Sequence, residues 1–175
     1  AAPYAATAPA DFMQVFTTGS SVYNNNQAPA TGGHTFLSGS GTENVTFGAS
    51  NDTVRSGAGA DTIAAGGGSD VIYAGSGADA ITTGAGNDFV EGGGGSDTVD
   101  ATGGGNNYIT DSTGNDSVTA GGGSDTIKPG AGADTIASGG GNDDVRAGSG
   151  ADTVTAGAGN DSIIGGGGAD TINMG

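Results

Sequence analysis

The sequence predicts an all-β parallel solenoid with 18 residues per coil, and three observations lead to this fold class. Aspartate recurs every nine residues, an apolar residue stands two places after each acid position, and glycines precede the acids. Glycine accounts for 40 of the 175 residues, although it makes up only about 7% of an average protein. This composition excludes a helical bundle, because glycine costs about 1 kcal/mol per helical position relative to alanine.

The aspartate ladder covers most of the chain. It runs in steps of nine over residues 61–97 and again over residues 116–170. Between these two runs, Asn107 holds the acid position of a ten-residue repeat. Toward the N-terminus the pattern decays, and the acid position is held in turn by Asp52, Glu43 and His34.

The residue two places after the acid position is aliphatic or aromatic in every repeat. Because side chains alternate along a strand, these residues are expected to point inward, where β-branched side chains stack well. The residue before the acid alternates between alanine and serine or asparagine, so the unit is a pair of nonapeptides with two strands and two glycine turns. Eight such coils would form a rod about 40 Å long. The inward residues are Phe36, Val45, Val54, Ile63, Ile72, Ile81, Val90, Val99, Ile109, Val118, Ile127, Ile136, Val145, Val154, Ile163 and Ile172.

The aspartates indicate a metal site that repeats along the solenoid. Aspartates 18 residues apart stack on one edge of successive coils, about 4.8 Å from each other. Bare carboxylates at this spacing raise each other's pKa values, so the arrangement favours a hard cation between them. Ligand oxygens from carboxylates and carbonyls, in a chain with one histidine and no cysteine, favour Ca²⁺ over zinc or copper.

The repeat resembles the RTX calcium-binding nonapeptide, Gly-Gly-x-Gly-x-Asp-x-(aliphatic)-x. The resemblance is clearest over residues 92–100 and covers about residues 38–173. It implies a right-handed parallel β-roll of about sixteen nonapeptides over residues 29–175, with Ca²⁺ in both rows of turns and about ten ions in all. On this resemblance, one edge carries Asp61, Asp79, Asp97, Asp116, Asp134, Asp152 and Asp170. The other edge carries Asp52, Asp70, Asp88, Asp125, Asp143 and Asp161.

Three features depart from the family pattern. The first glycine of the repeat is usually Ala, Ser or Thr, which matters little if only its carbonyl is used. Asn107 with its extra residue, and Ser112 and Thr113 in the next turn, are expected to weaken or delete one or two calcium sites. The family's C-terminal cap and export signal are absent from the sequence. The chain is therefore expected to be a fragment, a processed product or a module that stacks on something else.

Residues 1–28 differ from the repeats, because they are almost free of glycine and contain four of the nine aromatic residues. Phe12, Val15 and Phe16 fit either a helical turn or a strand, and the run is too short to decide. Solenoid ends need covers, so an irregular N-terminal cap is expected, with a binding or assembly segment as the alternative. His34 is expected to pack within this end rather than to bind metal.

The outward strand positions distinguish two faces. The outward positions of the sheet on the Asp61 edge form files of small residues, many of them threonine, as at Thr98 and Thr135. The opposite sheet carries every basic residue of the chain together with an apolar cluster, which suggests a contact surface. That cluster consists of Val71, Tyr73, Phe89 and Tyr108.

Composition also bounds the function. With 19 acidic residues against 3 basic ones, the chain lacks the positive charge that nucleic-acid binding requires. No apolar run approaches the roughly 20 residues of a membrane span. No nucleophile is paired with a base, and the carboxylates form a ladder rather than an isolated catalytic pair, so the protein is not expected to be an enzyme.

These observations favour a secreted, calcium-dependent structural protein at the cell surface or outside the cell. It is expected to fold on binding Ca²⁺ and to associate with itself head to tail, as a filament, surface layer or matrix. A cell-surface polysaccharide is a second candidate partner. One alternative is an RTX folding and export module detached from a larger secreted enzyme or adhesin. Another is an ice-binding β-solenoid, because flat threonine files on a calcium solenoid are similar to those of some ice-binding proteins.

Overall fold

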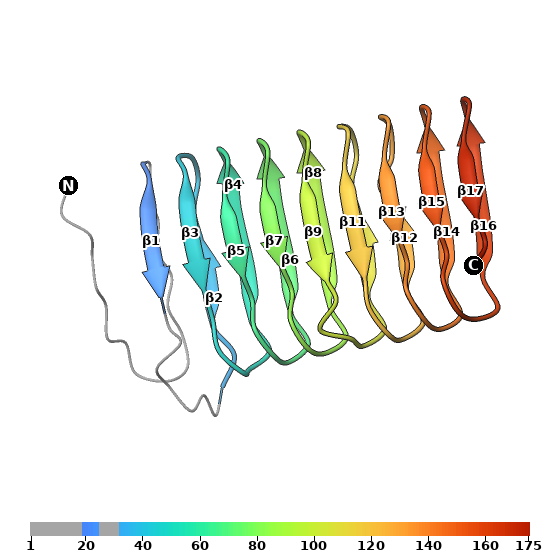
Figure 1. Cartoon of the computed structure of the whole chain (residues 1–175). Coiled ribbons are helices and arrows are strands. Elements are labelled where there is room, and N and C mark those ends of the chain that lie inside the picture. The colour runs from blue at the N-terminus through green and yellow to red at the C-terminus, as the bar shows by residue number, and fades with distance from the viewer. Residues whose placement is uncertain (1–18, 25–31) are drawn as a thin grey trace.

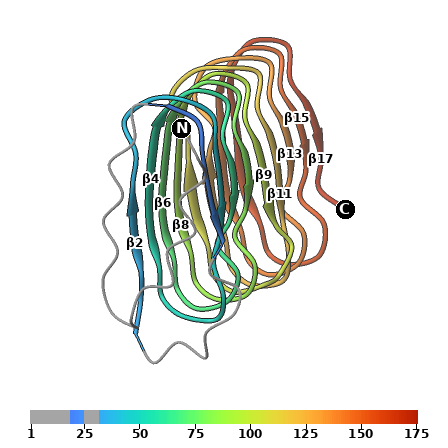
Figure 2. The same ribbon diagram turned by 90° about the vertical axis from the view of Figure 1, so that its left-hand side faces the viewer.

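The computed structural model describes residues 19–24 and 32–175, and this part of the chain consists of strands and turns. It winds into about eight coils, each of which adds one strand to each of two parallel sheets (Figure 1). The predicted all-β parallel solenoid is confirmed. The two sheets lie face to face along the whole rod, as the view turned by 90° shows (Figure 2).

Odd-numbered strands form one sheet and even-numbered strands form the other. The nine-stranded sheet contains β1 (Ser21–Asn24), β3 (Glu43–Thr46), β5 (Thr62–Ala64), β7 (Ala80–Thr82), β9 (Thr98–Ala101), β11 (Ser117–Ala120), β13 (Thr135–Ala137), β15 (Thr153–Thr155) and β17 (Thr171–Asn173). The eight-stranded sheet contains β2 (Thr35–Leu37), β4 (Thr53–Ala58), β6 (Val71–Ser76), β8 (Phe89–Gly94), β10 (Tyr108–Thr110), β12 (Thr126–Lys128), β14 (Asp144–Ser149) and β16 (Ser162–Gly167). Each strand pairs in parallel with the strand one coil away.

The core is a thin double file of Val, Ile and Phe side chains between the sheets. Residues at the same repeat position lie opposite each other in neighbouring coils, as Ile63 does with Ile81. The predicted inward residues from Phe36 to Val154 are all buried. In the last coil, Ile163 is only partly buried and Ile172 is 42% exposed, because no further coil covers them.

The first position of each turn, five residues before the acid, forms a second inward file that the sequence analysis did not predict. Most side chains at this position are buried and small, as Ala65 and Ala74 show; Phe47 and Asp111 are larger exceptions. Two buried serines at this position donate to a carbonyl in the next coil: Ser56 Oγ to the carbonyl oxygen of Ala74 at 2.9 Å and Ser138 Oγ to that of Ala156 at 2.8 Å. The side chain at this position therefore has to fit the interior. The choice of residue is more restricted than it would be if only the backbone carbonyl were used.

An aromatic cluster packs at the N-terminal end of the core. Strand β1 belongs to the segment 1–28 and pairs with β3. Its buried Tyr23 ring lies 5.8 Å from the ring of Phe36 and 5.2 Å from that of Phe47. The apolar residues that suggested a cap lie outside the described residues; they are Phe12, Met13, Val15 and Phe16.

His34 is buried in the same end, as expected from its place in a degenerate first coil. Its ring stacks on Phe47 with 5.6 Å between the centroids. Its Nδ1 lies 2.8 Å from Oδ1 of Asp52. The histidine thus packs against the start of the acid ladder.

The extra residue near Asn107 is absorbed by a local turn after β9. Oδ1 of Asp100 accepts hydrogen bonds from the backbone N–H of Thr102 at 3.0 Å and from its hydroxyl at 2.6 Å. Beyond this turn β10 pairs normally with β8, and Tyr108 lies opposite Phe89. The insertion changes the offset between coils from 18 to 19 residues without interrupting either sheet.

Candidate metal centres

A chain of hydrogen bonds links the acids along each edge of the solenoid. The backbone N–H of one aspartate donates to Oδ1 of the aspartate one coil later, as from Asp61 to Asp79 at 2.8 Å. The other edge repeats this bond, as from Asp52 to Asp70 at 2.7 Å. All thirteen predicted aspartates take part in these two chains, on the edges assigned from the sequence.

In twelve of the thirteen aspartates the second carboxylate oxygen is buried and has no such partner. A buried polar atom without a hydrogen bond is costly, and a buried charge more so, unless a counter-charge is present. The structure therefore orients one oxygen of each acid with the backbone and leaves the other available to a cation. Within the described residues, buried Oδ2 atoms without a hydrogen-bond partner belong to Asp52, Asp61, Asp70, Asp79, Asp88, Asp97, Asp116, Asp125, Asp134, Asp143, Asp152 and Asp161.

These residues fit Ca²⁺. The ion takes six to eight oxygen ligands, and the turns offer carboxylates and backbone carbonyls with no nitrogen or sulfur ligand among the ladder acids. Protein cations do not take its place along the ladder. Within residues 19–24 and 32–175, one ion pair joins His34 to Asp52 at the end of the ladder, and the other joins Arg146 to Asp144, which is not a ladder acid. The aspartate ladder is thus a row of hard-cation sites that needs positive charge from outside the chain.

The pKa values of the ladder acids lead to the same conclusion. Burial raises the pKa of Asp70 from 3.8 to about 7, and the neighbouring charges of Asp88 and Asp52 add to this rise. Burial likewise raises the pKa of Asp79 and of Asp116 to about 6. Hydrogen bonds from the backbone oppose these shifts without cancelling them. The ionised ladder therefore requires a compensating cation.

Asn107 keeps the backbone hydrogen bonds of the ladder. Its Oδ1 accepts from the N–H of Asp88 at 2.9 Å, and its own N–H donates to Oδ1 of Asp125 at 2.7 Å. Its second terminal atom is Nδ2, which donates to the carbonyl of Gly105 at 3.4 Å. The amide replaces the carboxylate as an acceptor but supplies neither the second oxygen nor the charge. Weaker calcium occupancy at this position remains a prediction.

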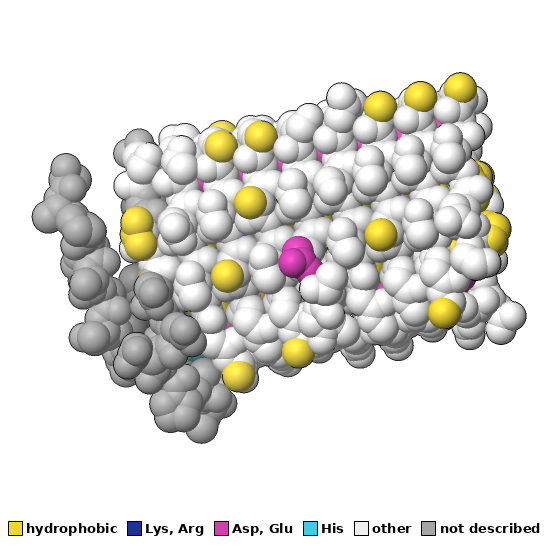
Figure 3. All heavy atoms as spheres, in the orientation of Figure 1, with side chains coloured by type: hydrophobic (Ala, Val, Ile, Leu, Met, Phe, Trp, Pro, Cys, Tyr) yellow, Lys and Arg dark blue, Asp and Glu magenta, His cyan; other side chains and the backbone are white. Residues whose placement is uncertain are grey.

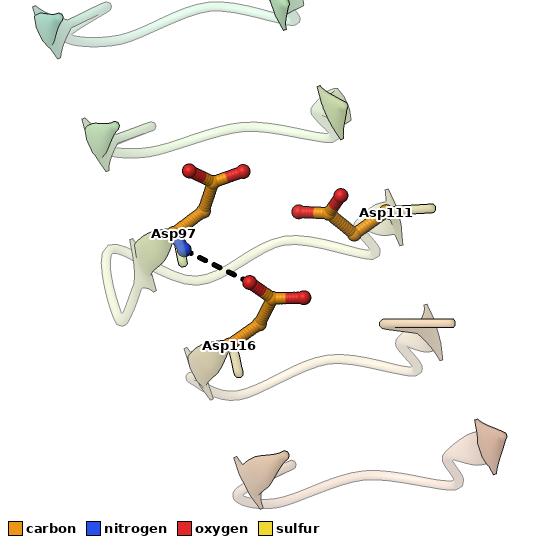
Figure 4. Close-up of side chains that lie close together, drawn as sticks. All are labelled: Asp97, Asp111 and Asp116. Atoms are coloured by element: carbon orange, nitrogen blue, oxygen red, sulfur yellow. Dashed lines mark hydrogen bonds between the residues drawn. The ribbon is translucent and has the colours of Figure 1, made fainter. Parts of the chain in front are cut away.

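Asp111 is a candidate ligand that the sequence analysis missed, because it does not belong to the nine-residue ladder. It follows β10, at the first position of the turn that leads to β11. Figure 4 shows its carboxylate directed across the turn toward those of Asp97 and Asp116. One oxygen from each of the three acids lies within 4.8 Å of the others. Burial and the adjacent Asp97 raise the pKa of Asp111 well above its usual range.

The sequence does hold a signal for Asp111. Other first positions carry small or uncharged residues, and Asp111 is the acid that departs from this rule. Because Asp111 does not fall on the nine-residue spacing of the ladder, the search for periodic acids passes over it.

The outer face of the eight-stranded sheet carries a row of rings and cations. Phe89 lies between Tyr73 at 5.6 Å and Tyr108 at 5.5 Å, measured between ring centroids. Arg55 covers the Tyr73 ring at 3.9 Å, and Lys128 lies 4.8 Å from the centre of the Tyr108 ring. The predicted cluster of aromatic and basic residues is present. Many of its ring faces already contact one another or a cation, which ties neighbouring coils together.

The face of the nine-stranded sheet is smooth and mostly uncharged (Figure 3). Its outward threonines stand in register, as Thr135 does with Thr153. Ala80 and Asp100 interrupt the two files in the middle of the rod. The predicted threonine-rich face is therefore present but not continuous.

Comparison with known proteins identifies the repeat. The RTX calcium-binding nonapeptide repeat (4 copies) matches residues 46–81, 73–104, 101–136 and 137–172. Neither the curated proteins nor the solved structures gave a match. No helix that could cross a membrane occurs in the part of the chain that the structure describes. Repeats of this kind are typical of secreted proteins. Because the four matches together cover most of the sequence, the chain belongs to the RTX calcium-binding nonapeptide repeat family.

Proposed function

We propose that this protein is a secreted structural module that is unfolded without calcium, folds into a rod when it binds Ca²⁺, and associates with itself end to end. The observation that carries the proposal is the double row of buried Oδ2 atoms without hydrogen-bond partners. No catalytic role is part of it, since the acids form repeating ladders rather than a pair in contrasting environments.

Charge and core size both support calcium-dependent folding. The formal net charge is −16, and most of the acids lie in the two ladders. The apolar core is a thin file, whereas ordering the backbone costs about 1 to 2 kcal/mol per residue. About ten Ca²⁺ ions would bring roughly twenty positive charges and reverse this balance. Extracellular calcium concentrations suit such a switch, and cytosolic concentrations do not.

The geometry of the last coil supports self-association. Strands β16 and β17 each pair on one side only, and Ile164, Ile172 and Met174 are exposed there. A further coil would bury Ile172 and Met174, which lie at inward positions, whether it came from a continuation of the chain or from a second copy. The proposal takes the second copy, whose β1 end presents the exposed Val22. Open strand edges accept further strands, and head-to-tail contacts build filaments unless they close into rings.

The folding part of the proposal is tested at neutral pH by circular dichroism and small-angle scattering, with chelator and with millimolar calcium. A random-coil spectrum and an expanded chain are expected in chelator, and a β spectrum with a rod-like scattering profile in calcium. A β spectrum that persists unchanged in excess chelator would contradict the proposal.

The assembly part is tested by light scattering and electron microscopy in calcium. Filaments that disperse on chelation are expected, and Ile172→Lys should shorten or abolish them by placing a charge in the end-to-end contact. Thr135→Lys, an exposed change in the middle of a face, is the matched control and should still form filaments. A calcium-loaded chain that stays monomeric at high concentration would favour the detached export module instead.

A further inference from the structure

Where the turn between β10 and β11 stacks on the turn between β8 and β9, three acids form a cluster that no other turns of the described residues show. Asp97 and Asp116 belong to the regular ladder, and the N–H of Asp97 donates to Oδ1 of Asp116 at 2.8 Å. Asp111 approaches them from the opposite side of the turn (Figure 4). Two stacked turns with one ladder acid each have a formal charge of −2, whereas this cluster has −3.

Two of the three acids are buried, and the hydrogen-bonding capacity of their carboxylates is incompletely satisfied. Asp97 is 1% exposed and Asp116 is 3% exposed, and the Oδ2 atom of each has no hydrogen-bond partner. Three carboxylates with oxygens within 4.8 Å of each other repel strongly when all are ionised. The basic side chains that contact the aromatic row lie on the outside of the eight-stranded sheet. The cluster therefore needs a cation of its own.

Gly92 makes the space for this third carboxylate. The strand pairing places Glu91 opposite Thr110 and Gly94 opposite Thr113, so Gly92 stacks on Asp111. A Cβ atom at position 92 would collide with Oδ2 of Asp111 and lie 2.8 Å from Oδ2 of Asp97. The backbone of Gly92 does not need glycine, because its φ is not in the left-handed region. The glycine is required here for room.

We propose that Asp97, Asp111 and Asp116 form a three-carboxylate Ca²⁺ site that binds more tightly than the two-carboxylate sites between neighbouring stacked turns and fills first. The inference rests on the calcium binding in the proposed function and adds a ligand outside the nonapeptide pattern. Calcium affinity in oxygen-ligand sites increases with the number of charged ligands. A trivalent lanthanide ion should favour the same site still more strongly, because the third carboxylate matches its third charge.

This site changes the expectation for Ser112 and Thr113. From the sequence, Ser112 and Thr113 are expected to weaken or delete a calcium site in this turn. In the structure, Ser112 has no positive φ and bonds to the carbonyl oxygen of Gly93 through its hydroxyl. The altered backbone accompanies the entry of Asp111, so the proposal makes the same turn the tightest site rather than a deleted one.

The test is a calcium titration of the whole chain by calorimetry with a competing chelator, repeated with terbium. One ion per chain should bind at least about tenfold more tightly than the rest. Asp111→Asn should remove this tight phase, and Gly92→Ala should weaken it by displacing the carboxylate. The matched control is Asp144→Asn, which removes one exposed acid and should leave the tight phase intact.

Hydrogen exchange at limiting calcium gives a second readout. Residues 111–116 should become protected at a lower calcium concentration than residues 129–134, and Asp111→Asn should abolish this order. Circular dichroism in saturating calcium checks that each variant folds. If the wild-type chain binds no calcium, the proposed function itself fails. If it binds calcium and Asp111→Asn leaves both the tight phase and the order of protection unchanged, only the present inference fails.

Discussion

The backbone N–H of Asp88 donates to Oδ1 of Asn107 at 2.9 Å, in the same way as other N–H groups of the ladder donate to an aspartate. The asparagine thus preserves the hydrogen-bonded architecture of its edge while removing one charge from it. One terminal atom of the side chain at position 107 accepts the backbone hydrogen bond, and the other terminal atom is the one that would bind a cation in an aspartate. The two functions can therefore be separated.

Asn107→Asp should therefore add a calcium ion to the chain. The substitution keeps the acceptor for Asp88 and restores the second oxygen that neighbouring coils supply. We expect the calcium stoichiometry from calorimetry to increase by one. Asn106→Asp, one residue away and exposed, is the matched control and should leave the stoichiometry unchanged. Equal stoichiometry in all three proteins would show that this coil already binds a full complement.

Much of the fold was predictable because every level of the sequence repeats with the same period. A one-residue error in the placement of Ile63 would move its neighbours to the wrong face, so sixteen consistent repeats fix the register of both sheets. The two hydrogen-bonded edges follow from the same spacing. The sequence also located the aromatic row, because outward positions alternate with inward ones.

The remaining features escaped because they are not periodic or depend on side-chain packing. Asp111 was passed over because its position in the repeat normally holds a small residue, and its role depends on the space left by Gly92 one coil earlier. The inward direction of the first turn position was missed because a turn residue such as Ala65 was considered only for its carbonyl. How Asp100 and Thr102 absorb the extra residue is a matter of local hydrogen bonds.

In a ladder acid, Oδ1 accepts a backbone hydrogen bond and Oδ2 is available to a cation. These two roles can be tested at Asp70. Asp70→Asn retains the acceptor for the N–H of Asp52 and removes the charge and the second oxygen. We expect the loss of about one bound Ca²⁺ and a lower melting temperature in calcium. Asp70→Ala should also leave the N–H of Asp52 unpaired, at a further cost of about 1 to 3 kcal/mol. Equal stability of the two variants in saturating calcium would contradict this division.

The raised pKa values predict that acid favours the metal-free fold. Asp70 titrates near 3.8 when unfolded and near 7 in the metal-free fold, chiefly because burial disfavours its charged form. The folded state therefore holds a proton that the unfolded state has lost, and its stability decreases as the pH rises through this window. Circular dichroism in chelator should show β structure at the acid end of the window and its loss toward pH 7.

Calcium binding should have the opposite dependence on pH. The ion requires ionised carboxylates, so binding releases protons, and the calcium affinity should decrease as the pH falls from about 7 toward 3.8. Calorimetry in buffers of different ionisation enthalpy measures the released protons. Proton release that is absent at the acid end of this window, where the metal-free fold is protonated, together with metal-free structure that is independent of pH, would show that burial does not control these acids.

The glycines of the turns should divide into two groups when each is changed to alanine. Gly77 has a φ of +136°, and an added Cβ would collide with the carbonyl oxygen of Gly59 in the preceding coil. Gly77→Ala should therefore cost more than the roughly 1 to 2 kcal/mol of a left-handed non-glycine residue. Gly67 lies outside the left-handed region, and its nearest neighbour would be Cα of Ala49 at 3.7 Å. Gly67→Ala should be neutral or should stabilise the fold by about 0.4 to 1 kcal/mol, because alanine restricts the unfolded chain. Thermal unfolding in saturating calcium measures both variants, and equal destabilisation would show that the close stacking of coils, rather than backbone conformation, limits every turn glycine.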